Sequence, residues 1–79
     1  MFNSYNFFGR TRYFDENPGR GYAVLRTGII KASNKEEAVE ELNSNDITVE
    51  KIRVKRTYKG ELEKVVIKED RVSGESLDD

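Results

Sequence analysis

The sequence predicts a small α+β domain in which a single antiparallel sheet carries one helix on one face. Three observations indicate this: an acid-rich amphipathic segment at about residues 34–44, β-forming segments before and after it, and a two-residue turn signal late in the chain. Seventy-nine residues leave room for one core only. We expect three or four strands in the order β-β-α-β-β, where the first element is either a strand or a loop.

The N-terminus is rich in aromatic residues, since six of the eight in the chain lie among the first fourteen positions. Buried, they would fill the core of a domain that is short of apolar bulk. Exposed next to arginines, they would stack on the bases of a single-stranded nucleic acid or contact a partner. Core filling is the simpler expectation, and the alternative makes Arg10, Arg12 and Tyr13 candidate binding residues.

A turn and a β-forming segment come next. Residues 15–19 contain adjacent Pro and Gly, which predicts a turn. The β-forming residues 22–32 do not alternate cleanly across Gly28. We therefore expect Gly28 to be either a bulge within one strand or a turn between two.

The helix is predicted from its N-terminal signal and its period. Ser33 and Glu36 have the spacing of a capping box, in which each side chain satisfies a free backbone amide of the first turn. Polar residues 43–46 end the segment after about three turns. The apolar stripe that would pack on the sheet consists of Ala38, Val39 and Leu42.

Residues 48–68 have the pattern of an antiparallel hairpin that turns at Lys59-Gly60, where glycine would adopt the positive φ of a tight turn. Pairing Tyr58 with Glu61 then fixes the register. One face becomes apolar, apart from Arg56 opposite Glu63, and needs the helix to cover it. That apolar face consists of Ile52, Val54, Val65 and Ile67, and the other face gathers Lys51, Arg53, Lys55, Lys64 and Lys68.

This register places Lys55 opposite Lys64 and Lys51 opposite Lys68. Directly opposed like charges cost about 0.2–1 kcal/mol per pair relative to a neutral pair. The basic face is therefore interpreted in two ways. It binds an anionic partner, or it is a solvated face whose lysines protect a sheet edge from aggregation.

Several classes of function are disfavoured by composition. The chain has no Cys and no His, so it lacks thiolate chemistry and the commonest metal ligand and general base. We expect no enzyme activity, no metal and no cofactor, and we interpret the helix glutamates as a solvated face. A secretory signal and a membrane span are both missing from the pattern, so cytoplasmic location is the default expectation.

Charge is distributed unevenly although the net charge is only −1. Basic residues predominate before residue 32, and five acids stand against Arg71 in residues 69–79. We expect residues 1–70 to form the domain and residues 71–79 to be a disordered acidic tail.

Residues 22–42, and most closely the sequence Ala32-Ser33-Asn34-Lys35-Glu36-Glu37-Ala38, resemble the strand-to-helix joint of small α+β proteins of bacteriophages and mobile elements. The resemblance covers about a quarter of the chain and brings no catalytic residue with it. It implies a noncatalytic regulator or inhibitor of a host system, of which anti-CRISPR proteins are an example.

The function expected from these observations is noncatalytic binding to a host protein or nucleoprotein complex. The alternative is direct binding of nucleic acid through the basic hairpin face, with help from Arg10 and Arg12. Exposed strand edges would also permit a homodimer. The candidate binding residues are Lys51, Arg53, Lys55, Lys64, Lys68, Arg10, Arg12 and Tyr13.

Overall fold

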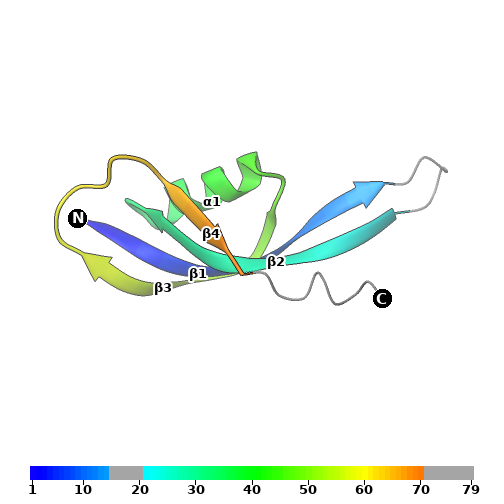
Figure 1. The fold of residues 1–79 in the computed structure, drawn as a ribbon, viewed down its shortest axis with the longest axis horizontal. Coiled ribbons are helices and arrows are strands. Elements are labelled where there is room, and N and C mark those ends of the chain that lie inside the picture. Colours follow the sequence, from blue (N-terminus) through cyan, green and yellow to red (C-terminus); the bar gives the residue numbers. More distant parts are fainter. Residues whose placement is uncertain (15–20, 71–79) are drawn as a thin grey trace.

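A computed structural model of the chain describes residues 1–14 and 21–70. It has one sheet with strand order β3-β1-β2-β4, in which every neighbouring pair is antiparallel, and one helix on one side of the sheet (Figure 1). The predicted α+β class, with one helix on a small antiparallel sheet, is confirmed. The elements are β1 (Phe2–Phe14), β2 (Gly21–Ala32), α1 (Lys35–Ser44), β3 (Thr48–Tyr58) and β4 (Val66–Glu69).

The aromatic N-terminal segment forms β1, a central strand of the sheet. It pairs with β2 along nearly its whole length and with β3 over residues 2–10. Side chains alternate between the two faces of a strand. Tyr5 and Phe7 therefore point to one face, where they are buried, while Phe2 and Phe8 point to the other and are half-buried. Alternation thus divides the aromatics between core and surface.

The core lies between α1 and the face of the sheet that it covers, which we call the helix face. Ala38 and Leu42 of the predicted apolar stripe are fully buried there, and Val39 is half-buried. Their neighbours in the core are Tyr5, Phe7, Ile30, Ala32 and Ile47, and Val49, Ile52, Val65 and Ile67 pack around them. The opposite face, which carries Phe2, Ser4, Asn6 and Phe8 of β1, is called the open face.

The helix begins one residue later than the capping-box prediction implies. Asn34 is the N-cap, and its Oδ1 accepts a hydrogen bond of 2.8 Å from the backbone N–H of Glu37. The Glu37 carboxylate in turn accepts one of 2.7 Å from the backbone N–H of Ser33. The prediction of Ser33 and Glu36 as the capping pair is wrong, because Asn34 is as good a cap as serine and also has a glutamate three positions on.

The predicted hairpin of residues 48–68 is wrong. Tyr58 pairs with Phe2 of β1 rather than with Glu61, and β4 pairs with β2. Residues 59–65 carry the chain from one edge of the sheet to the other, around the end where β1 begins (Figure 1). Gly60 has the expected positive φ of 99°, but it lies in this connection rather than in a tight hairpin turn.

The long β1 explains why the local turn signal does not decide the pairing. Its two edges both need partners, since a buried strand with unpaired amides would lose hydrogen bonds. Pairing β3 with β1 brings Ile52 next to the buried Phe7 on the helix face. A partner of four residues, which is the length of β4, would satisfy much less of β3.

Gly28 is neither a bulge nor a turn, because β2 continues through it in unbroken register with β1. It is needed because β4 approaches closely: a Cβ at this position would lie 2.2 Å from the backbone oxygen of Lys68. The irregular positions lie in β3 instead, where the register with β1 shifts at Glu50 and at Lys55. The predicted turn at residues 15–19 and the acidic tail at 71–79 lie outside the described residues.

Candidate functional site

The open face of the sheet gathers the basic side chains of all four strands. The register places Arg10 and Arg12 of β1 on this face together with Lys31, which lies opposite the open-face residue Ser4. The other cations on it come from the two edge strands. They are Lys51, Arg53 and Arg56 of β3, opposite Phe8, Asn6 and Ser4, and Lys68 of β4, opposite Ile29.

Carboxylates are nearly absent from the same face. The described strands contain two, Glu50 and Glu69. Glu50 lies at a register shift and forms an exposed ion pair of 3.0 Å with Arg10. Glu69 lies opposite Gly28 and contacts Arg26 on the helix face. The potential of the open face is therefore positive, although the whole chain is close to neutral.

The helix side of the molecule has the opposite charge. The helix α1 carries four glutamates, and Asp46 follows it. The helix lies on one side of the sheet (Figure 1). Because the basic open face is on the other side, positive and negative charge are separated across the domain. An anionic partner would be oriented toward the open face before contact.

A groove of about 690 Å³ crosses the open face near the start of β1. Ile29 and Val66 give it an apolar part, and Ser4 lies beneath, only 2% exposed. The groove runs from the edge strand β3 to the edge strand β4 and so has cations on both sides. Its remaining lining residues are Lys31, Lys55, Arg56, Tyr58 and Lys68.

Tyr58 is the aromatic side chain of the groove, and its ring is held in place. The Phe2 ring stacks on it with centroids 4.8 Å apart and planes 8° from parallel. Lys31 Nζ and Arg56 Cζ lie 5.3 and 5.7 Å from the centre of the Tyr58 ring. Hydrogen bonding with Ser4, and secondarily with Arg56, holds the pKa of the Tyr58 phenol below its usual value of 10.0.

Because of the register shift at Lys55, the residues that follow it in β3 point to the face opposite to the one that regular alternation would give. Val54 lies opposite the helix-face residue Tyr5, whereas Arg56 lies opposite the open-face residue Ser4. An extra residue in one strand of a pair has this effect, because it displaces the alternation by one. Lys55 and Arg56 consequently both line the groove.

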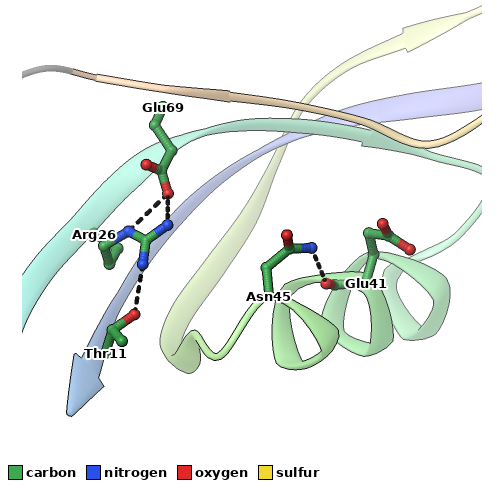
Figure 2. A network of polar contacts seen from close by, with 5 residues as sticks. All are labelled: Thr11, Arg26, Glu41, Asn45 and Glu69. Carbon is green, nitrogen blue, oxygen red and sulfur yellow. Dashed lines mark hydrogen bonds and ion pairs between the residues drawn. The ribbon is translucent and has the colours of Figure 1, made fainter. Parts of the chain in front are cut away.

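A polar network on the helix face joins β4 to β2 (Figure 2). Its β4 member, Glu69, directly follows the groove residue Lys68 in the chain. Arg26 of β2 donates from Nε and Nη2 to one Glu69 oxygen, at 2.7 and 2.5 Å. Its Nη1 donates to Thr11 Oγ1 of β1, at 2.7 Å. Three strands are thereby joined through one guanidinium group.

The structure brings together most of the residues predicted for binding, although the hairpin that was expected to carry them does not exist. Lys55 and Lys68 line the groove, and Lys51 and Arg53 lie on the same face farther along β3. Arg10 and Arg12 continue this face along β1. The role of these residues in binding stays a prediction.

Two predicted residues lie elsewhere. Lys64 is exposed in the connection between β3 and β4 rather than opposite Lys55. Tyr13 is on the helix-face side of β1, where it stacks on Tyr22 with ring centroids 5.3 Å apart. This pair lies on the two-stranded end of the sheet, beyond the residues that β3 and β4 pair with.

Sequence reasoning missed Lys31, Arg56, Tyr58, Phe2 and Phe8. Regular alternation predicts Arg56 and Tyr58 on the same face as Ile52, which is wrong. The register shift at Lys55 cannot be recognised from the residue pattern. Phe2 and Phe8 carried a usable signal: their even spacing from each other, and their odd spacing from Tyr5 and Phe7, is the period of a strand with two occupied faces.

Within residues 1–14 and 21–70, no group of three or more acidic side chains is arranged to hold a metal ion. No helix in this part of the chain is long and apolar enough to cross a membrane.

No protein family, no curated protein and no solved structure matches the chain.

Proposed function

We propose that this protein is a noncatalytic binding protein whose open face binds nucleic acid through its phosphate backbone. The observation that supports the proposal is the segregation of charge: every Lys and Arg of the described strands except Arg26 is on the open face or lines its groove. Phosphate contacts from lysine and arginine supply most of the affinity of sequence-independent nucleic-acid binding.

Two further features favour nucleic acid over an acidic protein surface. The cations are spread over four strands rather than clustered at one point, which suits a partner with regularly repeated charges. Half-buried aromatic rings lie among them, at Phe2, Phe8 and Tyr58. Rings among cations are the usual composition of surfaces on which nucleotide bases stack.

Interaction with a protein or nucleoprotein partner is the second candidate, and the exposed residues of the two-stranded end favour it. Tyr13 and Tyr22 stack on each other on the helix-face side of that end and are 42% and 62% exposed, so two large rings form one exposed aromatic surface. The narrower role of a phage or mobile-element regulator or inhibitor stays a prediction, as does cytoplasmic location.

The test is a titration of fluorescently labelled DNA and RNA oligonucleotides with the full chain, followed by fluorescence anisotropy at several salt concentrations. If the four groove cations each neutralise one phosphate, the logarithm of the binding constant falls with the logarithm of salt with a slope of about −3. Binding that is absent at low salt, or that does not depend on salt, contradicts the proposal.

A matched pair of charge reversals separates the open face from net charge. Lys68→Glu alters the groove and Lys35→Glu alters the exposed start of α1 on the acidic side, and both change the net charge by the same amount. We expect Lys68→Glu to weaken binding about tenfold, since it loses one phosphate contact and gains a repulsion. Lys35→Glu is expected to change binding by less than about twofold. Equal losses would show that the open face is not the binding surface.

A further inference from the structure

The groove on the open face has the size and chemistry of a site for a single unpaired nucleotide. Its volume of about 690 Å³ is within the range that encloses small organic ligands, about 300–1,000 Å³. Sites of this kind combine an apolar lining with a few placed polar groups. Here Ile29, Val66 and the Tyr58 ring supply the lining, and cations supply the polar groups.

A duplex does not match this arrangement, because its bases are stacked inside and its phosphates face outward. Charged phosphates would then meet the apolar part of the groove and lose their hydration without compensation. In a single strand the base is free to turn into the groove while the flanking phosphates stay outside. The cations that line the groove, and that such phosphates would contact, are Lys31 of β2, Lys55 and Arg56 of β3, and Lys68 of β4.

The rigidity of Tyr58 strengthens the argument. Its ring is already packed against the Phe2 ring, so little side-chain entropy is lost when a base packs against it. A solvated lysine-rich face would have no need of a positioned ring among its cations. A base-binding groove does, since aromatic contact is what retains a base independently of its identity.

We propose that the groove binds one unpaired nucleotide of a single-stranded nucleic acid, with the base against Tyr58, Ile29 and Val66 and the flanking phosphates on the surrounding cations. This inference rests on the proposed function, which it narrows from nucleic acid in general to single strands. It predicts that binding to a single strand is about tenfold tighter than binding to the same strand annealed to its complement, at equal salt.

Tyr58→Leu and Tyr22→Leu make a matched pair, because each removes one partly exposed tyrosine that stacks on another aromatic ring. Tyr58→Leu is expected to weaken single-strand binding about tenfold, with duplex binding nearly unchanged. Tyr22→Leu should leave both unchanged, and Tyr58→Phe should keep the single-strand affinity because the ring remains. Far-UV circular dichroism establishes that each variant is folded.

Photo-crosslinking to wild-type protein gives a second measurement that needs no variant. A single strand substituted with 5-iodouracil should crosslink to Tyr58 in preference to Tyr13 or Tyr22, as mapped by mass spectrometry of the peptides. Equal affinity for duplex and single strand, or crosslinks only at Tyr13 and Tyr22, would overturn the single-strand site while leaving salt-dependent nucleic-acid binding in place. Failure to bind either form would overturn both proposals.

Discussion

The close approach of β4 to Gly28 gives the sharpest test of the fold. A Cβ added at Gly28 would lie 2.2 Å from the Lys68 backbone oxygen and 2.8 Å from Glu69 Cα. Ordinary Cβ contacts are 3.4–4 Å. Because both neighbours are backbone atoms, no side chain can rotate to relieve the overlap. The substitution Gly28→Ala therefore requires β4 to move away from β2 by about 1 Å or more.

This movement would weaken both kinds of contact that hold β4 in place, its backbone hydrogen bonds to β2 and the packing of its apolar side chain. A displacement of this size takes ladder hydrogen bonds beyond about 3.5 Å, and losing two of them costs about 2 kcal/mol. Withdrawing the half-buried Ile67 from the core adds about 1 kcal/mol. We expect Gly28→Ala to lower the free energy of unfolding by about 3 kcal/mol, a large share of the stability of a domain this size.

Urea denaturation followed by circular dichroism measures this loss, and Gly60→Ala is the matched control. Both glycines have a positive φ, 159° at Gly28 and 99° at Gly60, but a Cβ at Gly60 meets no atom within 4 Å. Its cost is only that of the backbone conformation, about 1 kcal/mol. In the hairpin arrangement Lys68 would pair with Lys51 and lie away from Gly28. Equal destabilisation by the two substitutions would thus refute the strand order.

The helix cap, the Arg26 network and the Tyr58 phenol can each be tested by a substitution. Asn34→Ala should lower the free energy of unfolding by about 1 kcal/mol, because Asn34 provides the helix cap. Ser33→Ala should lower it by less than about 0.5 kcal/mol. If urea denaturation gave the reverse order, Ser33 would be the cap, as the sequence predicts. Arg26→Met should lower the free energy of unfolding by about 1–2 kcal/mol, because the guanidinium joins three strands in a partly buried site. Arg10→Met breaks an exposed ion pair and should lower it by less than about 0.5 kcal/mol. Equal shifts of the melting temperature for the two variants would contradict the network. Single-strand affinity should fall as the pH rises from neutral toward 10, because the lowered pKa of the Tyr58 phenol lets a phenolate form and repel phosphate. Tyr58→Phe should make this fall smaller. An identical pH profile for the variant would rule out a contribution of Tyr58.

The fold class and the helix were predictable because their signals are local. A period of 3.6 residues, a cap and a terminating polar run identify α1 from about a dozen residues. Strand pairing depends instead on which distant segments meet. The turn at Lys59-Gly60 is a real local preference, and Gly60 adopts the φ that it demands. It is overridden because β1 offers β3 a much longer partner than β4 does.

The part of the candidate site that lies on β3 could be predicted only where side chains alternate between the two faces without a register shift. Lys51 and Arg53 were assigned correctly to the face opposite Ile52, since no register shift lies between them. Arg56 was assigned to the apolar face because the shift at Lys55 cannot be seen in the sequence. Lys31 was missed for a different reason, as it joins the groove only when β2 and β4 are known to be neighbours.

The distribution of charge also contributes to the preference for this strand order over the hairpin. A hairpin would place Lys51 directly opposite Lys68 and Lys55 opposite Lys64, at a cost of about 0.2–1 kcal/mol for each pair. In the observed sheet Lys51 lies opposite Phe8 and Lys68 opposite Ile29. Each edge cation is thus next to a neutral side chain, and the two edges are separated by β1 and β2. The arrangement that avoids directly opposed lysines also spreads the positive charge over a whole face, which suits the repeated charges of a phosphate backbone.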